Sequence, residues 1–195
     1  MGCRLVALIV VLDIGHGVKP GRPYDPGATN GLLREVDLAR AYADHAAIIL
    51  SAAGLTVHRV DSGPYSDRHR RVCNVVMTSP GLYVQCHVNA GGGRYGLVEY
   101  DSRSSAGLRA AAVLAHALTA LPEASAGKTV GLSSGERGFT CISGIWPAPK
   151  MCGLIYEPGF IDTPQHAALW TAEGLQRVGR VLAAGVLDYA RTLTG

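Results

Sequence analysis

The stretch VVLDIGHG at residues 10–17 decides the fold of this chain, because it joins a buried strand to a histidine flanked by glycines. The apolar run that ends here extends from Leu5 to Leu12, which is the length of a buried strand. Gly15 and Gly17 allow the backbone to turn sharply and to approach a ligand closely. Open α/β sheets bind their ligands at the carboxyl ends of their strands, so His16 is a candidate functional residue. A single histidine is more often structural, and the hypothesis needs partners from elsewhere in the chain.

Strand and helix patterns alternate along the rest of the chain. Apolar runs predict further strands at residues 55–60, 82–90, 97–100 and 151–156, and a short one near 139–142 within the otherwise irregular segment 122–150. The spacing of apolar residues predicts helices at 32–53, about 66–77, 104–121 and 164–192, and proline and glycine predict a loop at 19–30. This order predicts a three-layer α/β fold, in which helices flank a twisted, mostly parallel sheet of about six strands. No linker or repeat interrupts the pattern, so residues 1–195 are expected to form one domain.

Composition and charge argue against several classes of protein. The net charge is +3 and the densest basic cluster is residues 68–71, which is too small for a nucleic-acid interface. The apolar N-terminal run is too short to span a bilayer and lacks a small-residue cleavage site, so neither a membrane segment nor a signal peptide is expected. The five cysteines are widely spaced and none forms a CxxC pair, which indicates synthesis in a reducing compartment and argues against a thiolate zinc site. The chain is therefore expected to be made in the cytoplasm.

Residues that can carry chemistry converge on one edge of the predicted sheet. His16, His87 and Glu157 lie at the ends of buried strands, and parallel strands bring their carboxyl ends together. Glu35 lies in the first turn of the helix after the His16 loop, so its carboxylate can face the same edge. Two imidazoles and one carboxylate form the ligand set of a catalytic zinc ion with a position open for water. A further carboxylate beside the metal can accept the proton of that water.

Five short motifs, in this order, resemble the type 3 family of zinc-dependent N-acetylmuramoyl-L-alanine amidases. They are LDIGHG at residues 12–17, DPGA at 25–28, the stretch 31–35 that ends in Glu35, HVNA at 87–90 and EPGFI at 157–161. The resemblance implies a catalytic domain that binds one Zn²⁺ ion through His16, Glu35 and His87, with Glu157 as the general acid/base. It also implies that the substrate is peptidoglycan, cleaved between the lactyl group of N-acetylmuramic acid and the L-alanine of the stem peptide.

The chain departs from the family pattern at three places. Before the strand that ends at His87 the family usually has an arginine followed a few residues later by Ala-Asn, but here Arg70 and Asn74 are offset and Cys73 replaces the alanine. Gln85 and Cys86 stand where the family usually has Ser-Ile, although His87 itself is kept. The segment 135–150, which includes Trp146, has no counterpart in the family. This segment would either shape substrate binding or form a surface excursion.

Several polar residues near the predicted edge have two open interpretations. Arg70 and Asn89 are predicted to contact substrate. Either Arg68 or Arg70 could correspond to the arginine that the family usually has before the strand that ends at His87. Asn89 could instead form a hydrogen bond that ends this strand. Glu99 would either line the cleft or be a solvated carboxylate at a strand edge.

The sequence gives less reason to place the remaining acidic and imidazole groups in the functional site. Asp13 and Asp25 would either orient a ligand histidine or cap a turn. The other histidines are expected on helices or at surface-facing strand positions, and they are His45, His58, His69, His116 and His166.

Two other functions remain open at this point. A similar sheet can carry another zinc hydrolase, such as a carboxypeptidase-like amidohydrolase that acts on a soluble peptide. A non-catalytic peptidoglycan-binding module would also keep the fold, but Glu157 argues against it, because a degenerate copy is expected to lose its proton carrier or a ligand. With no signal peptide and no separate wall-binding domain apparent, we expect a monomeric, endolysin-like enzyme that reaches the wall at lysis, or a secreted enzyme if the sequence is part of a longer protein.

Overall fold

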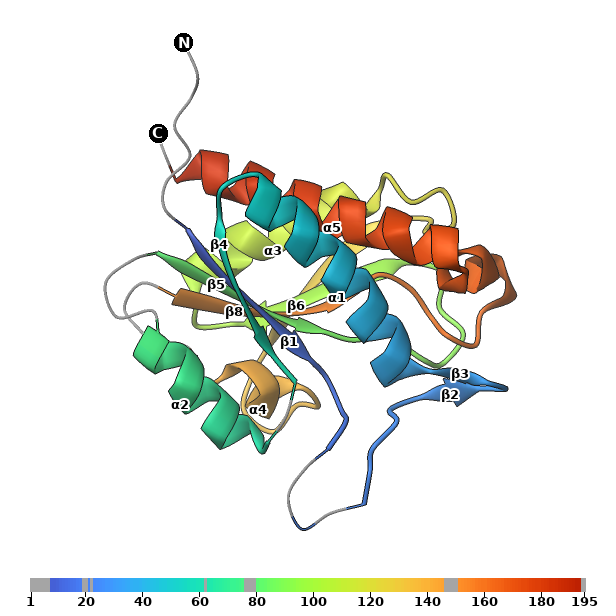
Figure 1. Cartoon of the computed structure of the whole chain (residues 1–195), viewed down its shortest axis with the longest axis horizontal. Coiled ribbons are helices and arrows are strands. Elements are labelled where there is room, and N and C mark those ends of the chain that lie inside the picture. Colours follow the sequence, from blue (N-terminus) through green and yellow to red (C-terminus); the bar gives the residue numbers. More distant parts are fainter. Residues whose placement is uncertain are drawn as a thin grey trace.

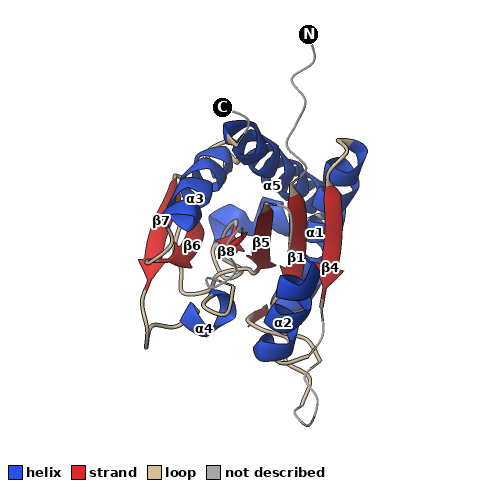
Figure 2. Cartoon of the chain, turned by 90° about the vertical axis from the view of Figure 1, so that its left-hand side faces the viewer, coloured by secondary structure: helices blue, strands red, loops and turns tan. Residues whose placement is uncertain are grey.

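Six strands form the central sheet: β1 (Ile9–Ile14), β4 (Thr56–Val60), β5 (Gly81–Cys86), β6 (Gly96–Asp101), β7 (Gly127–Leu132) and β8 (Met151–Glu157). The computed structural model describes residues 8–18, 21, 23–61, 63–75, 80–145 and 151–193. The strand order is β4-β1-β5-β8-β6-β7 (Figure 2). Neighbouring strands are parallel except for β6, which runs antiparallel to β8. The predicted mostly parallel sheet of about six strands is confirmed.

Helices cover both faces of the sheet, as the three-layer prediction requires (Figure 1). On one face lie α1 (Glu35–Ala52), α3 (Ser105–Leu118) and α5 (Ala172–Thr192), and on the other lie α2 (Tyr65–Val75) and α4 (Phe139–Ile142). A short antiparallel hairpin, β2 (Thr29–Asn30) and β3 (Leu33–Arg34), precedes α1. Within the described residues, no helix combines the length and the apolar character that crossing a membrane demands.

The alternation of side chains along the strands creates two cores. In β1, Val10 and Leu12 pack in the larger core with residues of α1, α3 and α5, whereas Val11 belongs to the smaller core with α2 and α4. The same parity holds in β5 and β8, where Tyr83 and Ile155 face the smaller core. Odd-numbered residues of β1, β5 and β8 therefore face α2 and α4. This alternation determines on which side of the sheet a polar residue near a strand end lies.

The prediction of a strand near residues 139–142 is wrong, because this run forms the short helix α4. Four apolar residues are too few for periodicity to distinguish a strand from a buried helical turn. Gly138, in the left-handed region with φ 89°, directs the chain into that turn. The structure also shows an unpredicted strand, β7, in the segment expected to be irregular. It lies at the edge of the sheet and exposes most of its side chains, so it lacks an apolar pattern.

Two predicted helices have different limits in the structure. The first begins at Glu35 rather than at residue 32, because β3 pairs with β2 immediately before it. The predicted helix 164–192 is divided into a 3₁₀ helix, η1 (Pro164–Trp170), and α5. Thr171 separates them: its backbone is extended, and its hydroxyl accepts a hydrogen bond from the N–H of Gly174 at 3.1 Å, capping α5.

Candidate metal centre and active site

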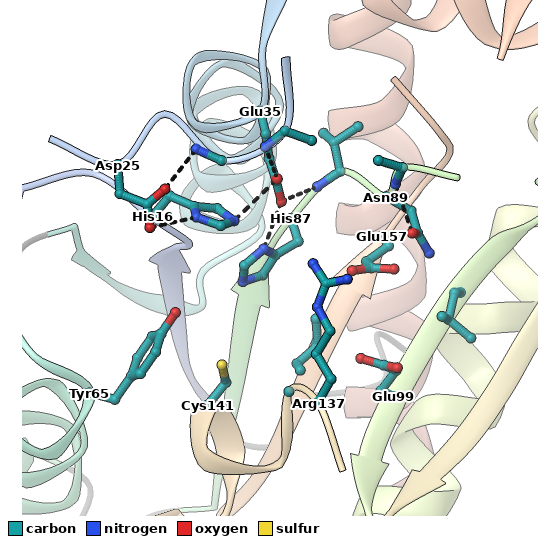
Figure 3. A pocket seen from close by; sticks show the side chains of 17 residues that line it. His16, Asp25, Glu35, Tyr65, His87, Asn89, Glu99, Arg137, Cys141 and Glu157 are labelled. Carbon is teal, nitrogen blue, oxygen red and sulfur yellow. Dashed lines mark hydrogen bonds and ion pairs between the residues drawn. The ribbon is translucent and has the colours of Figure 1, made fainter. Parts of the chain in front are cut away.

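Side chains at the carboxyl ends of β1, β5 and β8 line a cavity of about 430 Å³. His16 follows β1, His87 follows β5 and Glu157 ends β8. The three strands are parallel, so these ends meet at one edge of the sheet. Glu35, the first residue of α1, reaches the same cavity from the side (Figure 3). The structure thus brings together all four residues on which the sequence hypothesis depends.

Glu35 lies between the two histidines. Its Oε2 is 3.1 Å from His16 Nε2, and its Oε1 is 2.7 Å from His87 Nδ1. The backbone N–H groups of Ala28 and Val88 donate to the same carboxylate at 2.8 and 3.0 Å. Burial alone would raise the pKa of Glu35, but the hydrogen bonds with both histidines outweigh burial and hold the pKa well below its ordinary value. Glu35 is therefore an ionised carboxylate with a fixed position.

The second nitrogen of each imidazole is also engaged. Asp25 Oδ2 lies 3.0 Å from His16 Nδ1, and Gln85 Oε1 lies 3.1 Å from His87 Nε2. Partners of this kind fix the tautomer and the orientation of metal-binding histidines. Asp25 fulfils both interpretations left open by the sequence, since its Oδ1 also accepts the N–H of Gly27 at 3.0 Å. The role of Gln85 was not predicted, although strand alternation places it on the same face as His87 two residues later.

Two glycines leave the space in which these side chains meet. A Cβ atom on Gly15 would lie 2.3 Å from His87 Cε1, and one on Gly27 would lie 2.5 Å from Glu35 Oε2. Larger residues at either position would displace a member of the group. His16 itself has a φ of 64°, in the left-handed region that non-glycine residues seldom occupy. This backbone conformation aims the imidazole into the cavity.

The group formed by His16, Glu35 and His87 fits a zinc ion. One ligand atom from each residue lies within 4.8 Å of the other two. Two imidazole nitrogens and one carboxylate oxygen are a donor set typical of catalytic zinc, in which the fourth position is left for water. With Asp25 and Gln85 holding the far nitrogens, His16 Nε2 and His87 Nδ1 remain on the side of the carboxylate. No cysteine within the described residues belongs to the group.

Glu157 lines the cavity beside this group without joining it. Burial, together with the negative charges of Glu99 and Glu35, raises the pKa of Glu157 to about 8. Figure 3 shows its carboxyl group next to the side chain of Asn89. Asn89 also lines the cavity, and its Oδ1 accepts the N–H of Ala90 at 2.8 Å. Both interpretations of Asn89 are thus compatible with its position.

Two further charged residues line the same cavity: Glu99, for which the sequence left two interpretations open, and Arg137, which no sequence motif singled out. In the β6–β8 ladder Leu97 pairs with Glu157, so Glu99, two residues further along β6, lies diagonally from Glu157 on the same face of the sheet. Glu99 therefore faces the cavity. It is therefore a cleft residue rather than a solvated edge carboxylate, and burial raises its pKa to about 7. Arg137 comes from the segment 135–150, so this segment does shape the cavity. Trp146 lies outside the described residues.

Arg68 and Arg70, the two candidates for the family's arginine, have different surroundings. Arg68 is fully buried, forms an ion pair with Asp13, and donates to the carbonyls of Ile14 at 2.7 Å and His16 at 3.1 Å. Arg70 is exposed, pairs with a carboxylate on its own helix at 3.0 Å, and does not line the cavity. Arg68 thus holds the backbone that carries His16, while no contact of Arg70 supports the predicted substrate role.

Replacing Arg68 with methionine is expected to lower the free energy of unfolding by about 3–5 kcal/mol, because Asp13 would stay buried without its countercharge. Chemical denaturation of Arg68→Met, Asp13→Asn and the double variant measures this effect, and the double variant should recover part of the loss. The control is Arg70→Met, which breaks an exposed pair and should cost no more than about 1 kcal/mol. Equal stability of the two arginine variants would contradict the structural role of Arg68.

The five other histidines are not among the residues that line the cavity. Two of them are buried with backbone partners: the Nε2 of His69 lies 2.6 Å from the carbonyl of Cys141, and the Nδ1 of His166 accepts the N–H of Phe160 at 2.8 Å. Hydrogen bonds to the backbone therefore account for the buried positions of His69 and His166.

Comparisons with known proteins identify the family and the fold of the chain. A family model described as N-acetylmuramoyl-L-alanine amidase, Amidase_3, matches residues 10–188. Comparison with curated proteins gives no match. Among solved structures, Cwp6 from Clostridium difficile is 22% identical with a TM-score of 0.71, over 92% of this chain and 29% of that chain.

Two further solved structures match over nearly their whole length. The N-acetylmuramyl-L-alanine amidase Ami1 from Mycobacterium smegmatis is 19% identical with a TM-score of 0.75, over 97% of this chain and 100% of that chain. The catalytic domain of CD27L, an endolysin targeting Clostridia difficile, is 18% identical with a TM-score of 0.64, over 93% of this chain and 97% of that chain. At these identities the similarities show a shared fold.

Proposed function

The chain belongs to the N-acetylmuramoyl-L-alanine amidase family Amidase_3, and from this premise we propose that it is a zinc-dependent peptidoglycan hydrolase. The bond cleaved is the amide between the lactyl group of N-acetylmuramic acid and the L-alanine of the stem peptide. One observation carries the proposal: the metal-binding group of His16, Glu35 and His87 shares its cavity with the carboxyl group of Glu157.

In the proposed mechanism, His16, Glu35 and His87 hold the metal and Glu157 moves the proton. Zinc, when bound, supplies a Lewis acid that lowers the pKa of water to about 7 and polarises a carbonyl. Glu157 accepts the proton of the attacking water and then donates it to the nitrogen of the departing L-alanine. Asn89, which lines the cavity beside Glu157, is proposed to contact the substrate.

The surroundings of Glu157 suit both halves of this proton transfer. Burial and the charges of Glu99 and Glu35 favour the protonated form, which is the form that donates to the leaving amine. The positive charge of Arg137 favours the carboxylate, which is the form that accepts the proton from water. A general acid/base works best when its pKa lies near the operating pH, and these opposing influences bring the pKa of Glu157 into that range.

Intact peptidoglycan sacculi provide the test. The zinc-loaded protein is expected to release stem peptides that begin with a free L-alanine amine, detected by mass spectrometry of the soluble fraction. A carboxypeptidase-like enzyme would instead release single residues from the carboxyl ends of the peptides. A non-catalytic module would bind the sacculi and release nothing. Either of these two outcomes would overturn the proposed reaction.

The residues of a single chain supply the metal ligands, the proton carrier and the cavity walls. We therefore propose that the protein acts as a monomer on the cell wall. An endolysin-like role at lysis and a role as a secreted wall enzyme both agree with this chemistry.

A further inference from the structure

Three ionisable side chains point into the cavity and make no hydrogen bond or ion pair within the described part of the chain: Glu99, Arg137 and Glu157. The other ionisable groups at the metal centre are held by one another. The proposed function gives Glu157 the proton transfer and uses the charge of Arg137 only through its effect on Glu157, so the guanidinium group itself has no assigned ligand. Arg137 is also the one lysine or arginine among the described residues that line the cavity.

The fold directs Arg137 into the cavity. It lies between β7 and α4, and the next residue, Gly138, has a φ of 89°. A Cβ atom on Gly138 would lie 2.9 Å from Ile155 Cδ1, so the chain passes tightly over β8 at this point. Figure 3 shows the guanidinium group extending between His87 and Glu157. The charged end of Arg137 therefore stands beside the group that protonates the leaving amine.

The charge of Arg137 is available to a ligand. Glu99 and Glu157 lie near it in the cavity (Figure 3), and neither forms an ion pair with it in the described part of the chain. Burial raises the pKa of Glu99 to about 7, so this carboxyl carries only part of a negative charge near neutral pH. A planar guanidinium with free donors is suited to bind a carboxylate through two parallel hydrogen bonds.

The substrate offers a carboxylate at the corresponding place. Because Glu157 protonates the nitrogen of the L-alanine, the stem peptide departs on the Glu157 side of the metal centre, where Arg137 lies. In a stem whose second residue is a glutamate joined to the next residue through its side chain, the α-carboxyl group of that glutamate is not part of the peptide chain. This group, either free or amidated, therefore branches off the chain about two residue lengths, or roughly 7 Å, from the nitrogen of the scissile bond.

We propose that Arg137 binds the free α-carboxylate of the second stem residue, and that the enzyme therefore prefers stem peptides in which this group is not amidated. The inference rests on the proposed function and adds the substrate class to it. Arg137 acts in binding rather than on the reacting bond, so its removal should affect KM for the carboxylate substrate more than kcat.

The test uses two soluble muramoyl peptides of equal length that differ only in this group, a carboxylate in one and an amide in the other. The zinc-loaded wild type is expected to have a kcat/KM about 10- to 100-fold higher for the carboxylate, the range of a charge-assisted hydrogen-bond pair. Arg137→Gln should remove this preference by raising KM for the carboxylate alone. Arg137→Lys should keep part of it, because lysine retains the charge but not the planar pair of donors.

The matched control is Arg180→Gln, which removes an exposed arginine on α5 that does not line the cavity and should leave the preference unchanged. A wild type without preference, or a preference retained in Arg137→Gln, would overturn the inference. So would an equal loss of kcat on both peptides with KM for the carboxylate unchanged, since Arg137 would then act through Glu157 or the reacting carbonyl and not on the α-carboxylate.

Equilibrium binding separates this inference from the proposed reaction. Calorimetric titration of both peptides onto Glu157→Gln and onto Glu157→Gln/Arg137→Gln needs no turnover. Tighter binding of the carboxylate that disappears in the double variant supports the inference even if neither peptide is hydrolysed by the wild type. Equal binding of the two peptides to Glu157→Gln would overturn the inference even if both are hydrolysed.

Discussion

Replacing Glu157 with glutamine is expected to lower kcat for stem-peptide release by about 10²- to 10⁴-fold, the contribution usual for a positioned general acid/base. Glutamine keeps the size and polarity of the side chain but cannot carry the proton from water to the leaving amine. Glu157 is not a member of the metal-binding group, so the variant should still bind one zinc ion per chain. Steady-state kinetics together with elemental analysis of the purified variant measure both quantities. Lysis at the wild-type rate would remove Glu157 from the mechanism.

The same variant has a second readout in the metal-free protein. The pKa of Glu157 is about 8 in the folded chain against an ordinary value of 4.5. Between these values the folded state holds a proton that the unfolded state has lost. The contribution of Glu157 to stability is therefore complete below the lower value and is lost as the pH rises through about 8. In Glu157→Gln the free energy of unfolding should fall less over this interval, whereas the surface variant Glu173→Gln should follow the wild type.

Removing zinc with a chelator is expected to reduce stem-peptide release to the level of a sample without enzyme, and added Zn²⁺ should restore it. Without the metal, Glu157 faces bulk water, whose pKa is about 15.7, and the carboxyl group cannot generate hydroxide from it. His87→Ala removes one of three ligands and should lose both zinc and activity at zinc concentrations that saturate the wild type. Full activity in a sample shown by elemental analysis to contain no metal would contradict the zinc mechanism.

Thermal unfolding gives an independent measure of the same site. A ligand that binds only the folded state stabilises it by about 2.7 kcal/mol at 100 times its Kd. Zinc should therefore raise the unfolding temperature of the wild type but not that of His87→Ala. The matched control is His116→Ala, which removes an exposed histidine on α3 and should respond to zinc like the wild type.

The sequence was sufficient to predict the part of the fold that holds the metal-binding group. His16, His87 and Glu157 each lie where a strongly apolar run ends, and parallel pairing of these runs determines that their ends meet. By contrast, β7 is an exposed edge strand and α4 is a single helical turn, so neither has a periodic pattern long enough to be recognised. Whether these two segments form a strand or a helix depends on tertiary contacts, which the local sequence pattern does not reveal.

Three residues at the site were not assigned from the sequence, for different reasons. Gln85 was predictable, because alternation from His87 places it on the same face of the same strand. For Glu99 two interpretations stayed open, since the choice between them depends on β6 running antiparallel to β8, and sequence pattern does not specify the direction of a strand. Arg137 belongs to a segment without a recognisable motif, and only the packing of Gly138 over β8 shows where it points.

The reversed direction of β6 has a consequence for how this cavity can change. One wall of the cavity consists of residues in the middle of a hydrogen-bonded strand, Leu97 and Glu99, rather than of a connecting loop. A strand fixed on both sides, by β8 and by β7, does not tolerate insertions, whereas its side chains can be exchanged without altering the backbone. On this wall, new selectivity would arise by single replacements at positions 97 and 99, and the loop before α4 is left as the place where the cavity can vary in length.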